Sequence, residues 1–174
     1  MATHETVHSP TFQTAGFRFD HPLGPIHGWF STEGLSSLVL PREDDRALHI
    51  KVLHSSVNDG RVWALHAALE RYFADQPESF KDIPIDFGEC TDFQRKVWSA
   101  LRKIPWGKTA TYGDLSRELG YGPRASRAIG QAVGRNPLPI VVPCHRVLAC
   151  NGLGGFGAGL AWKQELLRLE GIEA

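Results

Sequence analysis

The sequence is poor in cysteine and in long apolar runs, and each shortage excludes a class of protein. Its 174 residues include only three cysteines. Because an odd number of cysteines without regular spacing is not a disulfide framework, we expect free thiols in a reducing, intracellular compartment. No apolar run has the length of a membrane-spanning helix, so we expect no membrane partner. The polar segment 1–10 lacks the basic-then-apolar order of a signal peptide, and residues 1–12 are predicted to be a loose tail.

The chain also lacks any net charge, but its charges are unevenly distributed. Residues 1–90 contain 7 Lys and Arg against 13 Asp and Glu, whereas residues 91–174 contain 12 against 6. The first part is therefore acidic, at −6, and the second basic, at +6. This asymmetry favours the C-terminal part as the one that meets a polyanion. An ordinary scatter of solvated charges is the alternative.

Periodicity predicts an α+β protein that begins with a small antiparallel sheet. Within residues 17–40, short apolar patches alternate with turn residues, as in a β-meander. Residues 83–87 indicate one more short strand. An amphipathic helix is predicted over residues 59–75 from the spacing of Val62, Leu65, Leu69 and Phe73. Composition changes near residues 88–91, so we predict an N-terminal domain over residues 1–89 and a second domain over residues 90–174.

The second domain is predicted to consist mostly of short helices. Thr91 or Asp92 is a suitable N-cap for the first helix, and Pro105 follows its end. Pro123 opens the third helix, which stops before Asn136. Two helices joined by a tight glycine turn and followed by strands are typical of a winged helix-turn-helix. The predicted elements are helices over residues 91–104, 111–120, 123–135 and 160–171, a strand over 138–142 and a hairpin-like return over 147–157.

The helix predicted over residues 123–135 is bare and basic. Several of its positions are alanine or glycine, and each interior glycine costs about 1 kcal/mol relative to alanine. Close approach of another surface is the usual compensation. Two interpretations compete, and the three arginines on this helix favour the second. The helix packs tightly against a neighbouring helix, or it carries Arg124, Arg127 and Arg135 into a nucleic-acid groove.

Two further motifs resemble ligand sites without meeting their requirements. The run GLGGFG, residues 152–157, matches G-x-G-x-x-G, but only 17 residues follow it, too few for a dinucleotide-binding βαβ unit. Its glycines either form turns or offer backbone N–H groups to a ligand. Seven of the eight histidines, including His49 and His54, lie in the first 66 residues without a nearby cysteine. Cys144, His145 and Cys150 lack a fourth partner, so no metal site is predicted.

Cys144 is ambiguous on local grounds. A lone cysteine is usually a small buried apolar residue, and Cys90 and Cys150 are interpreted in this way. Cys144 differs because a proline precedes it and because His145 and Arg146 supply positive potential that favours a thiolate. In an extended segment Cys144 and His145 would point to opposite faces. Proton transfer between them would then need a bend or a bridging water.

The order of several motifs resembles that of a known family. FQRKVW (93–98), IPWGKTATY (104–112), RAIG (127–130), NP (136–137), PCHRV (143–147) and a closing EG (170–171) occur in family order. Over residues 93–171 the sequence resembles the O6-alkylguanine-DNA alkyltransferases, the methylated-DNA–protein-cysteine methyltransferases. The N-terminal part is compatible with the variable sheet domain of that family, which is ribonuclease H-like.

The resemblance implies direct-reversal repair of double-stranded DNA without a cofactor. A flipped O6-alkylguanine would enter a pocket, and Cys144 would accept its alkyl group irreversibly in a single turnover, because a thioether does not exchange with thiols as a disulfide does. By resemblance, His145 takes the thiol proton through a water and Glu170 orients His145. Tyr112 would donate to the purine, and Lys163 would support the site electrostatically.

The resemblance also implies DNA and substrate contacts. Arg127 would fill the space left by the extruded nucleotide, and Asn136 would be a hinge between the basic helix and the active-site segment. The carbonyls of Cys144 and Val147 would accept the guanine amino group, and the backbone N–H near Gly157 would support the site. The implied DNA-binding residues are Arg124, Ser126, Arg127, Ala128, Arg135 and Tyr112. The implied substrate-binding residues are Val133, Asn136, Pro139, Val147, Phe156 and Gly157.

Three positions depart from the family pattern, and two other functions compete. Phe156 stands where a tyrosine is frequent, Gly157 where some members have serine, and Val133 where a larger wall residue occurs. The first competing function is a non-catalytic lesion sensor that binds O6-alkylguanine, although such proteins lack the reactive cysteine. The second is a transcription regulator that responds to its own alkylation. We expect a monomer, located in the cytoplasm of a prokaryote or the nucleus of a eukaryote.

Overall fold

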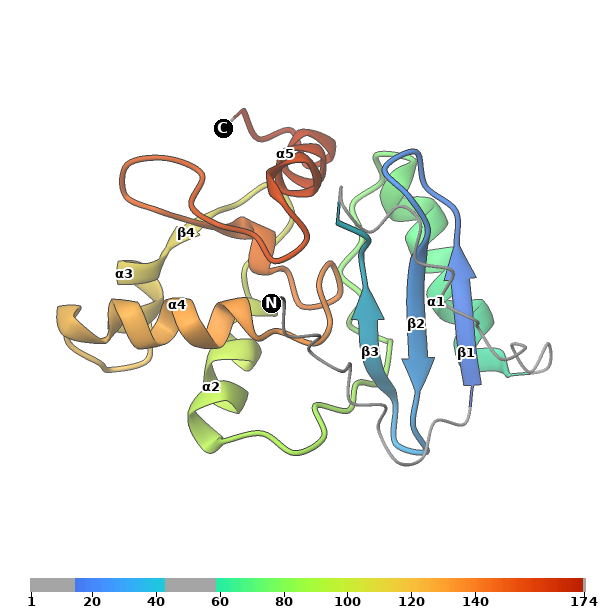
Figure 1. Cartoon of the computed structure of the whole chain (residues 1–174), viewed down its shortest axis with the longest axis horizontal. Coiled ribbons are helices and arrows are strands. Elements are labelled where there is room, and N and C mark those ends of the chain that lie inside the picture. The colour runs from blue at the N-terminus through green and yellow to red at the C-terminus, as the bar shows by residue number, and fades with distance from the viewer. Residues whose placement is uncertain (1–14, 43–58, 174) are drawn as a thin grey trace, which may run out of the picture.

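The computed structural model describes residues 15–42 and 59–173 and has an α+β architecture (Figure 1). Three strands form the antiparallel sheet β1-β2-β3: β1 is Ala15–Phe19, β2 is Ile26–Phe30 and β3 is Leu35–Val39. This confirms the predicted meander and the predicted fold class at the α+β level. Position 28 of β2 is a glycine because the Phe17 ring of β1 lies over it, and a Cβ there would collide with that ring. No helix in the described part of the chain is long and apolar enough to cross a membrane.

The helix α1, Gly60–Phe73, packs behind this sheet (Figure 1). Asp59 caps it by accepting a hydrogen bond from the backbone N–H of Arg61. Leu65 and Leu69 are fully buried, whereas Val62 and Phe73 are partly buried, in agreement with the predicted apolar face. The strand predicted over residues 83–87 is wrong: the segment makes only a single parallel bridge, Leu35 to Ile85.

The other α-helices of the described residues lie on the other side of the molecule (Figure 1). Thr91 begins α2 with a capping box, in which its hydroxyl accepts from the Gln94 N–H and the Gln94 side chain accepts from the Thr91 N–H. Gly120, at a φ of 75°, closes the next helix in the left-handed conformation that glycine tolerates. The helices are α2 (Asp92–Leu101), α3 (Tyr112–Glu118), α4 (Ser126–Gly134) and α5 (Leu160–Leu169).

The structure corrects two predictions in this part. Residues 123–135 are not one continuous α-helix, because Pro123–Ala125 form a 3-10 turn before α4. The strand expected over residues 138–142 is absent: this segment consists of turns and leads into a second 3-10 turn, Cys144–Arg146. The hairpin-like return over 147–157 is present only in part. It contains the short strand β5 (Val147–Leu148), parallel to β4 (Ala110–Thr111), and one antiparallel bridge from Ala149 to Gly152.

Backbone and side-chain hydrogen bonds join the sheet side to the helical side. The Leu38 N–H donates to the Pro137 carbonyl at 2.9 Å, and the Trp162 indole donates to the Pro41 carbonyl at 2.9 Å. The Arg102 guanidinium donates to the Phe80 carbonyl at 3.1 Å. The buried apolar residues form one cluster that extends from β1 to α5. The sheet therefore braces the segment that precedes Cys144.

The expected tail over residues 1–12, like His49 and His54, lies outside the described residues.

Candidate active site

A tight turn places Cys144. Ile140 has a φ of 75°, a conformation that costs free energy for a β-branched residue and is held only by its surroundings. The turn is closed by the Val142 N–H, which donates to the Leu138 carbonyl at 2.7 Å. Asn136 fixes the turn from within: its Oδ1 accepts from the Leu138 N–H at 3.0 Å, and its Nδ2 donates to the Val142 carbonyl at 2.8 Å.

The sulfur of Cys144 is nearly enclosed, with 8% of the residue exposed. Burial raises the pKa of the Cys144 thiol above its ordinary value, because a buried thiolate loses its hydration. The two largest effects against this shift come from Asn136, whose Nδ2 donates to Sγ at 3.1 Å, and from the charge of the Lys163 ammonium. Backbone hydrogen bonds from Cys144 and His145 also lower the pKa. At neutral pH the group is therefore a thiol, and a base is required to activate it.

His145 is completely buried beside Cys144 in the same 3-10 turn. Its Nε2 lies 2.8 Å from Oε1 of Glu170. Because an ionised carboxylate can only accept, Nε2 must carry a hydrogen. The other ring nitrogen, Nδ1, has no hydrogen-bond partner among the described residues. Burial lowers the pKa of His145, and Glu170 partly opposes this shift. His145 is thus a neutral imidazole whose Nδ1 can accept a proton.

Glu170 follows the last residue of α5 and is buried among hydrogen-bond donors. Arg146 binds both of its oxygens, with Nε 2.8 Å from Oε2 and Nη2 2.9 Å from Oε1. Burial by itself would raise the pKa of Glu170, but the hydrogen bonds from His145 and Arg146 lower it to about 2. Glu170 is therefore ionised at neutral pH and holds the Nε2–H of His145 in place.

Arg146 does not have the neighbour expected from the sequence. We predicted that His145 and Arg146 would supply positive potential to the Cys144 sulfur. Instead, the Arg146 guanidinium is directed to Glu170 and to the Ile104 carbonyl, at 2.5 Å from Nη1. The pKa of Cys144 is lowered by the Asn136 side chain, by the charge of Lys163 and by backbone hydrogen bonds from Cys144 and His145, and not by Arg146. The prediction failed because consecutive residues in a 3-10 turn point in different directions.

Lys163 of α5 is fully buried and organises the loop that follows β5. Its ammonium donates to three backbone carbonyls, those of Val147 at 2.7 Å, Leu153 at 2.5 Å and Gly155 at 3.2 Å. Burial lowers the pKa of Lys163 to about 8, although the nearby Cys144 opposes the shift. The side chain thus supplies a buried positive charge next to the thiol and holds the glycine-rich loop against α5.

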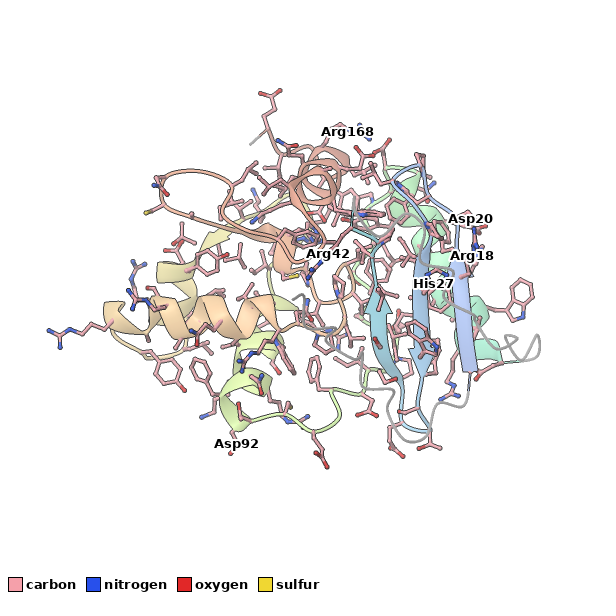
Figure 2. All side chains as sticks on the ribbon, in the orientation of Figure 1. Arg18, Asp20, His27, Arg42, Asp92 and Arg168 are labelled. Carbon is pink, nitrogen blue, oxygen red and sulfur yellow. The ribbon has the colours of Figure 1, made fainter. Side chains whose placement is uncertain are left out.

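The remaining predicted substrate residues lie at different depths around this centre. Tyr112 begins α3 and is half-buried, and burial is the main reason that its pKa is raised, so its phenol stays protonated and can donate a hydrogen bond. Val133 and Val147 are buried, while Pro139 and Phe156 are half-buried. Gly157 is exposed, and its carbonyl accepts a hydrogen bond at 3.0 Å from Nε of Arg42. The Arg42 side chain lies in the middle of the view in Figure 2.

The predicted DNA-binding side chains lie on and around α4. Arg124, Arg127, Ala128 and Arg135 are exposed, and Ser126 is half-buried. A Cβ at Gly130 would make an ordinary contact with the Tyr112 ring at 3.7 Å, and one at Gly134 would meet nothing within 4 Å. Close packing inside the protein therefore does not explain Gly134.

The glycine-rich loop contains one glycine that the backbone requires. Gly154 has a φ of 71° and is a turn glycine, whereas a Cβ at Gly155 or Gly157 would meet no atom within 4 Å.

The sequence interpretation missed one residue that contacts this centre. Tyr72 of α1 is buried, and its hydroxyl donates to Oε1 of Glu170 at 2.8 Å and lies 3.3 Å from Nε2 of His145. Tyr72 is separated from these residues by 98 and 73 positions, and it lies outside every motif that suggested a site.

Among residues 15–42 and 59–173, no group of three or more His, Cys, Asp or Glu side chains is arranged to hold a metal ion.

Comparisons with known proteins give a consistent result. Residues 92–172 match the family described as 6-O-methylguanine DNA methyltransferase, DNA binding domain. The methylated-DNA–protein-cysteine methyltransferase of Methanosarcina acetivorans is 42% identical over 155 residues, which cover 88% of this chain and 96% of the relative. The protein of the same name from Mycobacterium bovis is 39% identical over 156 residues, covering 87% of this chain and 88% of the relative.

Solved structures resemble the whole described fold. Mycobacterium tuberculosis OGT in complex with DNA superposes with a TM-score of 0.73 at 34% identity, covering 90% of this chain and 92% of the other. The O6-methylguanine DNA methyltransferase of Methanococcus jannaschii superposes with a TM-score of 0.66 at 31% identity, covering 91% and 95%. Because the likeness extends over nearly the full length of these relatives, the chain belongs to the methylated-DNA–protein-cysteine methyltransferase family.

Proposed function

We propose that this protein repairs alkylated DNA by direct reversal, transferring the alkyl group of O6-alkylguanine irreversibly to its own Cys144. The observation that carries the proposal is the buried combination of a thiol with a neutral histidine whose Nδ1 has no partner among the described residues. A nucleophile beside a base that a third group orients is the arrangement used in covalent catalysis. Glu170 is the orienting group.

The chemical step balances without a cofactor. The thiol proton of Cys144 passes through a water to Nδ1 of His145, and the thiolate attacks the alkyl carbon in line. A C–S bond forms as the bond from that carbon to O6 of guanine breaks, and the electron pair moves onto the purine. Tyr112 donates a hydrogen bond to the leaving base, a role for which its raised pKa keeps the phenol protonated, and the guanine takes up the proton that His145 received. Lys163 stabilises the negative charge that the site carries during transfer.

Recognition of the lesion is assigned to α4 and the loops that surround Cys144. Arg127 enters the duplex in place of the flipped nucleotide, which costs a few kcal/mol of stacking and pairing. Ser126 and Ala128 of α4, with Arg124 and Arg135 just outside its two ends, contact the DNA, and the unfilled space beside Gly134 supports close approach of the duplex. Asn136 is the hinge that ties this helix to the active-site turn, as its contact with Val142 supports.

The substrate pocket is assigned to the residues on either side of the sulfur. Val133 and Pro139 form one wall, and Phe156 stacks on the purine without the hydroxyl that a tyrosine would add. The carbonyls of Cys144 and Val147 accept the guanine amino group, and the backbone near Gly157 closes the pocket. The Val147 carbonyl already accepts from Lys163, so the guanine would use its second lone pair.

We also infer the finer architecture and the setting of the protein. The chain divides into a ribonuclease H-like sheet domain over residues 1–89 and a winged helix-turn-helix domain over residues 90–174. The helices α3 and α4 and the short pair β4–β5 support the second assignment. The protein acts as a monomer inside the cell, where its three free thiols, Cys90, Cys144 and Cys150, stay reduced.

The proposal is tested by counting transferred groups. The protein is incubated with duplex DNA that contains O6-methylguanine, and its peptides are analysed by mass spectrometry. We expect one methyl group per molecule, located on Cys144, and no transfer by Cys144→Ser, which should still bind the DNA. A methyl group on Cys90 or Cys150 would overturn the assignment of the nucleophile. Binding without any transfer by the native protein would favour the lesion sensor.

A further inference from the structure

The buried ring of Tyr72 brings α1 into contact with the catalytic base. Its neighbours hold the ring from three sides, with centroids 5.3 Å from Phe73, 5.5 Å from Phe80 and 5.0 Å from Trp106. Its hydroxyl reaches Oε1 of Glu170 at 2.8 Å and Nε2 of His145 at 3.3 Å. Oε1 of Glu170 therefore accepts hydrogen bonds from both the imidazole of His145 and the phenol of Tyr72.

We propose that Tyr72 is a positioning residue for alkyl transfer. Its hydroxyl donates a hydrogen bond to Glu170 and so helps to hold His145 in the tautomer whose Nδ1 can accept the Cys144 proton. This inference rests on the proposed function. It gives the acidic N-terminal part of the chain a direct role at the site, through a residue that touches neither the sulfur nor the DNA.

The single proton of the hydroxyl reinforces the tautomer that the contact between Nε2 and Glu170 already requires. A phenol has one hydrogen to donate, and here two acceptors compete for it. The ionised carboxylate of Glu170 is the stronger acceptor and the nearer one, at 2.8 Å against 3.3 Å. Donation to Nε2 instead would place the ring hydrogen on Nδ1, and an Nδ1–H cannot take a proton from the thiol. Donation to Glu170 leaves Nε2–H to bind the same carboxylate.

The hydroxyl also moderates the charge that His145 experiences. The groups that face His145 come from three elements: Glu170 and Lys163 from α5 and its end, Cys144 and Arg146 from the 3-10 turn, and Tyr72 from α1. Glu170 raises the pKa of His145, whereas Arg146 and Lys163 lower it. By donating to Oε1, Tyr72 takes up part of the negative charge of Glu170. Without this hydroxyl, Glu170 would stabilise the imidazolium more strongly.

The test compares Tyr72→Phe with the native protein in single-turnover transfer from methylated duplex DNA, over pH values around the ordinary histidine pKa of about 6.5. Transfer requires neutral His145, so the rate rises with pH through the pKa of this group. We expect the midpoint of this rise to move up by about one unit in Tyr72→Phe, the effect of losing one hydrogen bond to a charged group. DNA affinity should not change, because Tyr72 is buried.

Tyr121→Phe is the matched control. Tyr121 packs edge-on against Phe93, at 5.5 Å between ring centroids, and within the described part of the chain this side chain has no contact with His145 or Glu170. Its variant should keep the native midpoint. If Tyr72→Phe also keeps the native midpoint, Tyr72 only fills space and the inference is wrong.

A second measurement is made on the native protein and does not depend on activity. In the native protein, the nitrogen-15 shifts of His145 report which ring nitrogen carries the hydrogen, and the signals are assigned by their loss in His145→Gln. We expect hydrogen on Nε2 and none on Nδ1 at neutral pH. A protonated Nδ1 would overturn the inference. A native protein that has the expected tautomer but transfers no methyl group would contradict the proposed function alone.

Discussion

The side-chain amide of Asn136 joins the end of the basic helix to the sulfur of Cys144, with Nδ2 3.1 Å from Sγ. The same nitrogen donates to the Val142 carbonyl, and Oδ1 accepts from the Leu138 N–H. One side chain thus sets the position of the turn and lowers the pKa of the thiol within it.

Asn136→Ala should therefore impair both the turn and the nucleophile. Loss of the hydrogen bond to the sulfur raises the pKa of Cys144, and we expect transfer from methylated DNA to slow by about tenfold or more, equivalent to about 1.4 kcal/mol. The rate at which a small alkylating reagent labels Cys144, followed by mass spectrometry against pH, reports the thiol pKa directly. Asn151→Ala, in an exposed loop, is the control. An unchanged pH profile would show that Asn136 does not tune the thiol.

Glu170→Gln should change how the free energy of unfolding depends on pH. The pKa of Glu170 is lowered in the folded protein, from its ordinary 4.5 to about 2. Its ionised form therefore stabilises the fold fully above pH 4.5, and this contribution, about 3 kcal/mol, is lost as the pH falls from about 4.5 to about 2. Denaturant unfolding across this range should give a flatter profile for Glu170→Gln. Glu118→Gln, on the exposed face of α3, should match the native slope.

Arg127→Ala should separate DNA binding from chemistry. Arg127 is exposed on α4, away from the buried Cys144. We expect weaker binding to methylated duplex DNA by about tenfold, and a slope of log affinity against log salt reduced by about one. Transfer from the free base O6-benzylguanine should proceed at the native rate. Arg168→Ala, on α5 at the top of the view in Figure 2, is the control. A lost reaction with the free base would place Arg127 in the chemical step instead.

Lys163→Met should loosen the loop that follows β5. The variant leaves the carbonyls of Val147, Leu153 and Gly155 without their common donor, and a buried unpaired carbonyl costs about 1–3 kcal/mol. We expect a lower free energy of unfolding and slower transfer, because the positive charge beside Cys144 is also lost. Hydrogen exchange should increase most in residues 148–156. Lys103→Met, exposed after α2, should change neither property.

Local sequence determined much of the helical part. The capping box from Thr91 to Gln94 uses contacts only three residues apart, and the glycine at position 120 ends its helix by its own backbone preference. The alternation of apolar and turn residues was likewise sufficient to predict the meander. Short-range interactions of this kind are encoded where they act, so pattern and spacing reveal them.

The sequence failed where distant contacts override local preference. The β-branched residues before Cys144 favour a strand. Hydrogen bonds to the Asn136 side chain and to the backbone of β3 stabilise turns in this segment instead, and Ile140 has a positive φ. The side-chain directions of His145 and Arg146 depend on the 3-10 turn that results.

The sequence by itself thus determined the family motif and most helices, because these depend on residues close together in the chain. Only the tertiary structure decided that Tyr72, 98 residues before Glu170, shares an oxygen with His145. A hydroxyl in an amphipathic helix carries no local signal of its partner, because its partner is brought to it by the packing of α1 against the end of α5.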